Sequence, residues 1–319
     1  MNMKTVYLNK FMSSVVAELE MNGQYGTAHV CGSVLRSVMA FDGEGLPVSG
    51  ITPLWLKAYE GYLRHKGGKG LAWNTVSTYM RMLQAVYNRA VVRKLAAFIP
   101  HQFRDVFTGR KADHRRVLER DDMQKLLLDR EPDITSPGMA WARACLELMF
   151  RFHGMPFVDL AHLRKSDLKD GYLTLRRRKT GMPLSARVDG RAMQLLERYR
   201  NRDDTSPYLL CFLDGNLEGM AAYRDYQRIL RLLNSRLRAL ALWKKVQGKV
   251  TSYSARHTWA TVGRYCHIPI EVISEGLGHA SVTTTEGYMK GFGNSRMDRA
   301  NKVIMNYIFK GLSNAVDKW

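Results

Sequence analysis

The sequence predicts a mainly α-helical protein with a small β-sheet, folded as two domains. Three observations lead to this prediction. The chain has 319 residues, enough at roughly 150 residues per domain for two hydrophobic cores without disulfide or metal staples. Apolar residues recur at helical spacing through most of the chain. The alternation typical of strands is clear in one place, residues 171–188, and it predicts a single hairpin there.

The first domain is expected to span residues 1–99 and to be entirely helical. Thr52 followed by Pro53 predicts a helix start, because threonine caps free N–H groups and proline suits the first helical position. Asn74 or Thr75 is expected to cap the longest helix, and the glycine-rich segment 66–70 predicts the loop before it. The expected helices cover 10–22, 24–41, 54–65 and about 74–96.

Residues 100–117 predict a basic linker, because Pro100, Gly109 and basic runs interrupt any apolar period. The second domain is expected over 118–293, mostly helical, with Lys179 at the tip of its hairpin. Residues 294–319 predict a helical tail with one apolar face. Segment 160–168 is expected to end an amphipathic helix. Further helices are expected from about 120 and over 139–152, 191–200, 221–245, 253–266 and 270–277.

The charge of the chain is one-sided, with 49 Lys+Arg against 29 Asp+Glu and a formal net charge of +20. Residues 61–100 hold seven basic side chains and no acid, and residues 221–250 hold eight against Asp225 alone. Like charges along a helix oppose it, so such stretches indicate an external anion such as a phosphate backbone. The side chains expected to contact DNA are Arg64, Lys66, Lys69, Arg81, Arg89, Arg93, Lys94, Arg177, Arg228 and Arg231.

Composition and spacing exclude several classes of protein. No apolar run approaches the ~18 residues of a membrane span, and the first residues lack the apolar stretch of a secretory signal. The four cysteines lie far apart and form no CxxC, which argues against a disulfide framework or a zinc knuckle. The histidines show no ligand spacing. We therefore expect a cytoplasmic, nucleoid-associated protein without metal or cofactor.

Four segments of the second domain carry side chains suited to chemistry on phosphate. Each alone is a weak signal, since a Gly-His pair after a helix is commonly a cap and a single tyrosine is usually structural. Their order and spacing together carry the information. The segments are LAHLRKSDL at 160–168, RRRKTG at 176–181, ARHTWAT at 255–261 and GLGHASVTTTEGYM at 276–289.

With these motifs, the chain resembles the tyrosine recombinase (phage-type integrase) family over nearly all of its length. The family pairs a helical core-binding domain with a catalytic domain, and the two clamp DNA. The resemblance therefore implies a SAM-like core-binding domain at 1–99 and an α+β catalytic domain at 118–293. It places the catalytic arginine on Arg256, the hairpin lysine on Lys179, the His/Trp position on His279 and the nucleophile on Tyr288.

The resemblance also implies the chemistry of these residues. Tyr288 attacks a phosphodiester and forms a covalent 3′-phosphotyrosine, so that resealing needs no ATP. Arg256 neutralises the oxygens of the transition state with a planar fork, without a metal. Lys179, on a mobile hairpin tip, protonates the leaving 5′-oxygen as general acid. His279 hydrogen-bonds the phosphate or the nucleophile.

Two positions depart from the family pattern. Tyr253 stands where the family most often has histidine, and a phenol donates a hydrogen bond but is a poor base. The family's first catalytic arginine falls on His153 when HGMPFVD is compared with the RGMPFVD of related sequences, whereas the commoner R-x-x-E spacing would put Pro156 there. Arg151 is a candidate substitute, although two residues rotate a side chain about 200° around a helix. Either His153 takes part in the site or it only ends a helix.

The predicted function is site-specific DNA recombination by a homo-tetramer on two duplexes, through a Holliday junction. Integrase of a mobile element and DNA invertase are the favoured roles, ahead of a Xer-like resolvase or a type IB topoisomerase. The expected partner is double-stranded DNA with inverted-repeat core sites, with accessory DNA-bending proteins as a further option. The tail packs either on its own domain or, as in the family, on a neighbouring protomer. The alternative is a non-catalytic or weakly catalytic DNA-binding architectural protein, which the change at position 153 keeps open.

Overall fold

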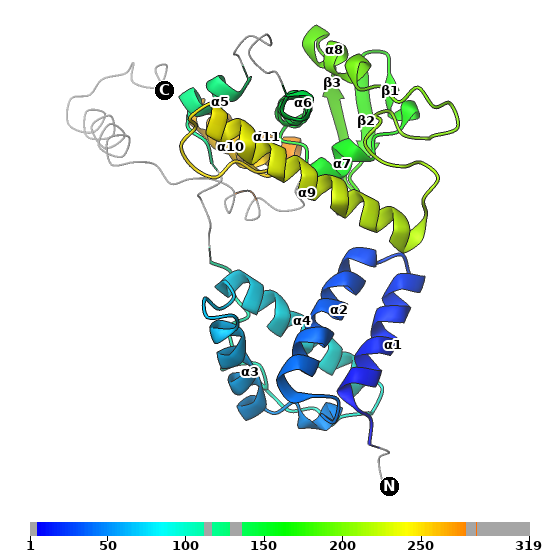
Figure 1. The fold of residues 1–319 in the computed structure, drawn as a ribbon, viewed down its shortest axis with the longest axis vertical. Coiled ribbons are helices and arrows are strands. Elements are labelled where there is room, and N and C mark those ends of the chain that lie inside the picture. Colours follow the sequence, from blue (N-terminus) through cyan, green and yellow to red (C-terminus); the bar gives the residue numbers. More distant parts are fainter. Residues whose placement is uncertain (1–4, 112–116, 128–135, 279–284, 286–319) are drawn as a thin grey trace, which may run out of the picture. The chain divides into compact units, whose positions relative to one another are not determined.

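A computed structural model of the chain describes residues 5–111, 117–127, 136–278 and Thr285. The chain forms two compact units, one of Met1–Ala112 with Leu217–Tyr223 and the other of Asp113–Asn216 with Arg224–Trp319 (Figure 1). The fold is mainly helical with one small sheet, as predicted. Among the described helices, none combines the length and apolarity that a membrane crossing requires.

The first unit is a helical domain around one core. Its helices are α1 (Leu8–Met21), α2 (Tyr25–Asp42), α3 (Pro53–His65) and α4 (Trp73–Val92), with a short 3-10 turn at Val48–Gly50. The backbone N–H of Trp55 donates to Thr52 Oγ1 at 3.2 Å and Pro53 opens α3, which confirms the predicted cap. Tyr59, Met80 and Leu83 are fully buried in the core.

The ends of α4 differ from the prediction. Asn74 does not cap the helix, because its side chain binds the backbone of Lys111 instead, donating to the carbonyl and accepting from the N–H, both at 2.8 Å. The helix begins at Trp73 after an uncapped Ala72. It also stops earlier, since Lys94 adopts φ 57° and the N–H groups of Lys94 and Leu95 donate back to Val91 and Ala90.

Segment 100–111 packs on the first unit, beyond the predicted boundary at residue 99. Phe103 and Val106 are buried in the core of this unit. The N–H of Phe107 donates to Glu60 Oε1 at 2.7 Å, and Ser77 Oγ donates to the Gly109 carbonyl at 2.6 Å. Backbone and side-chain bonds therefore fix a stretch whose composition resembles a free linker.

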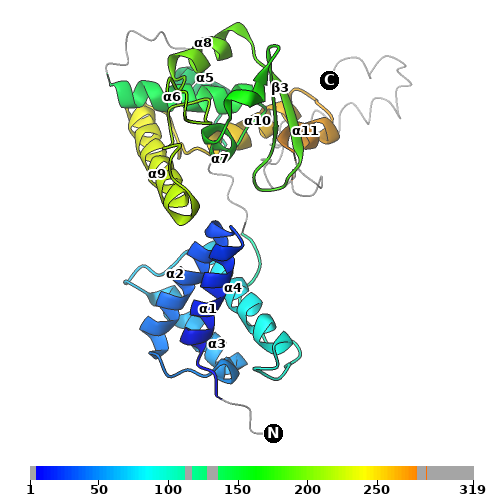
Figure 2. The ribbon, with the colours of Figure 1, turned by 90° about the vertical axis from the view of Figure 1, so that its right-hand side faces the viewer.

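The second unit is organised around α6 (Pro137–Arg151), which is buried over most of its circumference. It packs against α7 (Phe157–Ala161), α8 (Gly190–Arg198) and α10 (Ser254–Tyr265), and these helices lie near it in both Figure 1 and Figure 2. The sheet is antiparallel in the order β1-β2-β3, with Leu173 opposite Ala186 and both facing the core. The other elements are α5 (Arg120–Leu127), α7 (Phe157–Ala161), a 3-10 turn (Lys165–Asp167), β1 (Leu168–Lys169), β2 (Tyr172–Arg176), β3 (Pro183–Arg187), α8 (Gly190–Arg198), α9 (Gly219–Trp243), α10 (Ser254–Tyr265) and α11 (Ile270–Leu277).

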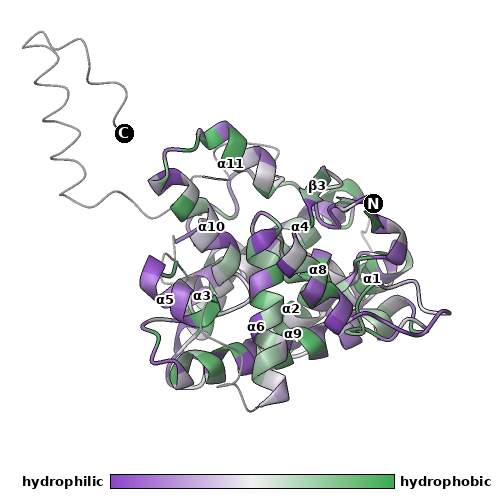
Figure 3. Ribbon diagram, turned by 90° about the horizontal axis from the view of Figure 1, so that it is seen from above, coloured by the Kyte–Doolittle hydropathy of each residue, from purple (hydrophilic) through white to green (hydrophobic). Residues whose placement is uncertain are grey.

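The prediction of a helix end over 160–168 was wrong. The helix α7 ends at Ala161, and the chain then pairs with segment 207–209: the Leu209 N–H donates to Leu163 O at 2.7 Å and the Lys165 N–H to Pro207 O at 3.0 Å. This long-range pairing takes the backbone groups that a longer helix would use. The amphipathic α11 follows its predicted bounds, with Ile273 and Leu277 buried and Glu271 exposed. Figure 3 shows hydrophobic and hydrophilic residues together along its ribbon.

Candidate active site

Arg256 lies at the centre of the candidate site. It belongs to α10 and is 5% exposed. Its Nη1 donates to the Gly154 carbonyl at 3.1 Å, and its Nη2 donates to the Leu277 carbonyl at 2.7 Å. A Cβ on Gly154 would lie 2.9 Å from the Arg256 Cα, so α10 approaches this turn at a distance that only glycine permits. The guanidinium is therefore held in one place by two separate segments.

His153 precedes this glycine and adopts φ 57°, just after the end of α6. Its ring lies 5.7 Å from the Trp259 ring, centroid to centroid, and its Nδ1 is buried without a hydrogen-bond partner among the described residues. Burial lowers the pKa of this imidazole, and the positive charge of Arg177 lowers it further. The structure thus brings His153 beside the Arg256 turn as a neutral side chain near pH 7.

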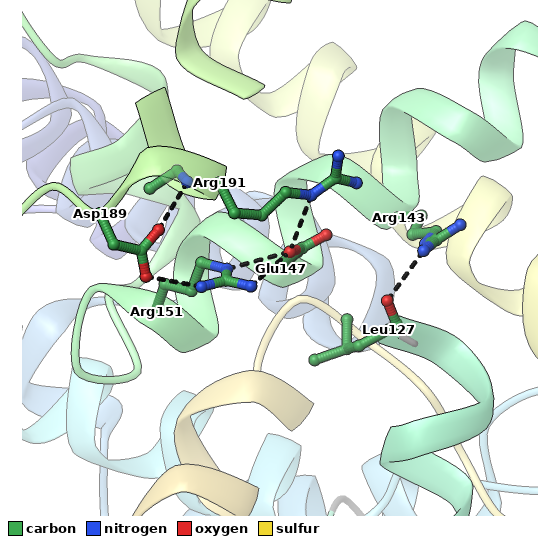
Figure 4. A network of polar contacts seen from close by, with 7 residues as sticks. Leu127, Arg143, Glu147, Arg151, Asp189 and Arg191 are labelled. Carbon is green, nitrogen blue, oxygen red and sulfur yellow. Dashed lines mark hydrogen bonds and ion pairs between the residues drawn. The ribbon is translucent and has the colours of Figure 1, made fainter. Parts of the chain in front are cut away.

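Arg151 lies in a different cluster (Figure 4). Its Nη1 donates to Asp189 Oδ2 at 2.6 Å and its Nε to Glu147 Oε1 at 2.9 Å. Glu147 also accepts from Arg191 Nε at 3.3 Å. Two carboxylates therefore occupy the Arg151 guanidinium and tie α6 to α8, which argues against Arg151 as a substitute for an arginine at position 153.

The hairpin forms as predicted, with Lys179 in its turn and exposed. The Arg177 N–H donates to Met182 O at 2.9 Å and the Gly181 N–H donates to Arg177 O at 2.8 Å, which closes the turn. Arg177 itself is 3% exposed. Its Nη1 lies 3.4 Å from Asp159 Oδ2, and its Nη2 donates to the Gly276 carbonyl at 3.2 Å.

Asp159 is a site residue to which sequence reasoning gave no role. It lies on α7, is 3% exposed, and accepts the Arg178 backbone N–H at 3.0 Å. Burial raises the pKa of its carboxyl, although the Arg178 N–H and the charges of Arg177, Arg256 and Arg178 act in the opposite direction. The signal in the sequence is one acid within the apolar run FVDLA, which amphipathic spacing alone does not separate from an exposed position.

Of the remaining predicted catalytic residues, the structure describes Tyr253 but not His279 or Tyr288. Tyr253 is 41% exposed at the start of α10, with its ring 6.3 Å from the His257 ring. His279 and Tyr288 lie outside the described residues. Gly278, the last described residue before His279, ends α11 with φ 62°. Within the described residues, no group of His, Cys, Asp or Glu side chains is arranged to hold a metal ion.

The residues predicted to contact DNA have different surroundings. In the first unit, Glu18 forms ion pairs with Arg89 at 3.5 Å and Arg93 at 2.6 Å. Residues 61–100 contain no acidic residue, but two of their arginines therefore pair with an acidic side chain of another helix, α1. On α9, Arg228 pairs with Asp225 at 2.7 Å, and Arg231 is exposed. Lys69, Arg81 and Lys94 are exposed, Arg64 lies 4.5 Å from the Trp73 ring, and Lys66 lies 5.3 Å from the Tyr62 ring. The tenth, Arg177, is not at the surface as the predicted DNA contact requires, because it is 3% exposed and lies beside Asp159.

Curated tyrosine recombinases share part of this sequence. The tyrosine recombinase XerA of Pyrococcus furiosus is 29% identical over 140 residues, which is 43% of this chain and 46% of the relative. XerA of Pyrococcus horikoshii is 27% identical over 140 residues with the same coverage. The chain spans about half the length of these relatives.

Solved structures share the fold over most of the chain. A λ integrase fragment, a dimer bound to a COC′ core site, superposes with a TM-score of 0.64 at 19% identity, over 91% of this chain and 97% of that one. The Tn1549 transposon integrase in complex with transposon right end DNA gives 0.62 at 16% identity, over 95% and 99%. Residues 7–104 match the phage integrase SAM-like domain, and residues 116–292 match the phage integrase family. The chain belongs to the phage integrase family, the tyrosine recombinases.

Proposed function

We propose that this chain is a site-specific DNA recombinase that cuts and rejoins DNA through a covalent 3′-phosphotyrosine. The observation that carries the proposal is the buried Arg256, fixed between the Gly154 turn and the end of α11. A guanidinium held in this way is preorganised for phosphate, because no reorganisation is needed as charge develops. The exposed Lys179 on its hairpin supports the same reading, since a mobile ammonium reaches a leaving group.

The reaction proceeds in two balanced steps. The Tyr288 hydroxyl loses its proton to water as its oxygen attacks phosphorus, and the bond to the 5′-oxygen breaks, with Lys179 giving that oxygen its proton. Arg256 neutralises the non-bridging oxygens, while His279 and Tyr253 donate hydrogen bonds to the phosphate. In the second step, a 5′-hydroxyl from the partner duplex gives its proton to Lys179 and attacks the phosphotyrosine. The bond from phosphorus to Tyr288 then breaks, the tyrosinate takes a proton from water, and the DNA backbone is restored. No nucleotide cofactor enters, because the phosphotyrosine stores the bond energy.

His153 is where we propose that catalysis is weakened. An arginine there would offer a fixed charge and two donors, whereas a neutral imidazole offers a single donor. The loss of one donor aimed at transition-state charge typically costs ~10²–10³ in rate. We therefore expect slow cleavage with DNA affinity intact.

The protein acts, in this proposal, as a tetramer on two inverted-repeat core sites, in the cytoplasm at the nucleoid. Support comes from the related structures: λ integrase occurs as a dimer on a core site and as a tetramer on a Holliday junction. DNA affinity should fall steeply with salt through counterion release. A log K against log salt slope shallower than about −3 would contradict phosphate contacts from both basic stretches.

The decisive test is a suicide substrate, a nicked core site that traps the covalent adduct. The protein should become attached to a DNA 3′ end in the presence of chelator. Tyr288→Phe should abolish the adduct and leave binding intact, because only the attacking oxygen is lost, and Tyr265→Phe serves as the matched tyrosine control. An adduct that persists in Tyr288→Phe identifies another nucleophile. A natural chain that binds but forms no adduct under any condition favours the architectural alternative, for which the neutral His153 is the motivating observation.

A further inference from the structure

Arg177 is the buried member of a run of basic residues. Arg176, Arg178 and Lys179 on either side of it are exposed, whereas Arg177 is 3% exposed. A guanidinium removed from water costs several kcal/mol unless other groups pair with it. The position of Arg177 is therefore specified by what it contacts inside the unit.

Its partners come from two elements far apart in the sequence. Asp159 on α7 lies 3.4 Å from Nη1, and the Gly276 carbonyl at the end of α11 accepts from Nη2 at 3.2 Å. The second oxygen of Asp159 accepts the Arg178 N–H at 3.0 Å. One carboxylate thus holds both the side chain of Arg177 and the backbone of the next residue, at the base of the hairpin.

The same guanidinium also packs against the turn that follows α11. A Cβ on Gly278 would lie 2.3 Å from Arg177 Nε, so the chain passes directly over the arginine. At the end of α11 itself, the Gly276 carbonyl accepts from Arg177 and the Leu277 carbonyl accepts from Arg256. His279 follows immediately in the sequence.

We propose that Arg177 is a positioning residue, which fixes the hairpin that carries Lys179 relative to Arg256 and to the end of α11. This inference rests on the proposed function. Lys179 is two residues from Arg177, so a shift at the base of the hairpin moves the ammonium. Proton transfer in the transition state depends steeply on such placement, and misplacement by about 1 Å costs ~10² in rate.

The test compares Arg177→Gln with Lys179→Ala and with Arg176→Gln, the exposed neighbour on the same hairpin. Each variant is assayed for adduct formation on two suicide substrates, one natural and one with sulfur in place of the bridging 5′-oxygen. A thiolate leaves without a proton, since thiol pKa values lie near 8.5. We expect Arg177→Gln to lose about 10²-fold on the oxygen substrate and to recover most of it on the sulfur substrate. Lys179→Ala should behave alike, and Arg176→Gln should stay near the natural rate.

A second readout measures the positioning directly. Hydrogen exchange should become faster in Arg177→Gln at the Arg178 and Gly181 amides, which Asp159 and the hairpin turn protect. Asp159→Asn breaks the bridge from the other side and should give both effects if Arg177→Gln fails to fold. Equal losses of Arg177→Gln on both substrates while Lys179→Ala recovers, or unchanged exchange at these amides, would overturn the inference. If Lys179→Ala is not recovered by sulfur, the general-acid role in the proposed function is wrong, and the exchange result alone then decides the role of Arg177.

Discussion

Two buried carboxylates of the second unit, Glu147 and Asp159, lie among arginines in different ways. Glu147 and Asp159 are both 3% exposed. Glu147 Oε1 receives Arg151 at 2.9 Å and Arg191 at 3.3 Å, all within or at the ends of regular helices (Figure 4). Asp159 has one guanidinium at 3.4 Å and one backbone N–H, and its neighbours belong to a hairpin base and a helix end.

These different surroundings indicate different roles for the Glu147 cluster and the Asp159 cluster. The Glu147 cluster joins α6 to α8 through short ion pairs and so stabilises the packing of these two helices. The Asp159 cluster is looser, and burial raises the pKa of its carboxyl in spite of three nearby arginines. Ion pairs that compensate burial poorly add little stability. What the Asp159 cluster does is bring together the irregular segments that carry the candidate catalytic side chains.

The largest expected effect is on stability, at Glu147. Glu147→Gln should lower the free energy of unfolding by about 3–5 kcal/mol, because Arg151 and Arg191 lose the carboxylate between them. Asp159→Asn should cost less stability, since the folded protein stabilises that carboxylate poorly. Urea unfolding of both variants and the adduct rate measure the contrast. Two outcomes would contradict the difference between the Glu147 and Asp159 clusters. One is an equal loss of stability in both variants, and the other is a greater loss of adduct rate in Glu147→Gln at a temperature where both variants are folded.

The second expected effect concerns His162, which follows α7 and so borders the Asp159 cluster. Burial, and then the charge of Arg178, lower the pKa of His162 to about 4 from its ordinary value of 6.5. As pH falls below 6.5, His162 binds a proton in the unfolded chain but stays neutral in the folded chain. The free energy of unfolding therefore decreases between pH 6.5 and about 4. By pH 5 the loss should reach about 2 kcal/mol.

Urea unfolding at pH 7 and pH 5 measures this loss, and His162→Gln should reduce it. His65→Gln, at an exposed histidine of α3, is the matched control and should keep the full pH dependence. A natural chain whose stability does not change over this range would mean that the environment of His162 is more polar than its contacts with Tyr208 and Tyr226 indicate.

The third expected effect restores charge beside the turn at Gly154 that binds Arg256, where His153 lies. His153→Arg should raise the adduct rate at least ~10-fold and barely change DNA affinity, because the gain is in transition-state charge. The natural protein should also cleave faster at acid pH, below the ordinary histidine pKa of 6.5, because the imidazole, whose pKa is lowered by burial and by Arg177, gains a proton only there. That acid-side rise should be absent from His153→Arg. An unchanged rate in the variant would show that His153 does not face the phosphate.

The smallest effect is expected at Glu18, an exposed carboxylate between Arg89 and Arg93. Glu18→Gln should change the free energy of unfolding by less than about 1 kcal/mol, because exposed ion pairs contribute little. It should tighten DNA binding, since two arginines become available to phosphates. Binding measured at two salt concentrations checks this. Weaker binding would place Glu18 outside the DNA interface and leave the two arginines with a structural role.

The sequence was a good guide to regular elements and a poor guide to how irregular ones assemble. Helical spacing predicted α1 to α4, α6 and α8 to α11 closely, because each buries one apolar stripe. Helical spacing gave a wrong prediction over 163–168, because backbone groups there form hydrogen bonds with the distant segment 207–209. It also gave no role to Asp159 and no burial to Arg177, because both depend on partners more than 15 residues away. Local patterns do not contain such contacts.

Two long-range hydrogen bonds described above have a consequence for the synthesis of this chain on the ribosome. Arg256 binds the Gly154 carbonyl across 102 residues of chain, and Arg177 reaches Gly276 across 99. Because chains emerge from the ribosome N-terminus first, the first unit and the hairpin are complete while these partners are still unsynthesised. Contacts of such long sequence separation also form late in folding. In terms of the proposed function, a nascent chain holds the side chains expected to bind DNA before the Arg256 site is assembled, and the proposed capacity to break a strand arises only when synthesis is nearly finished.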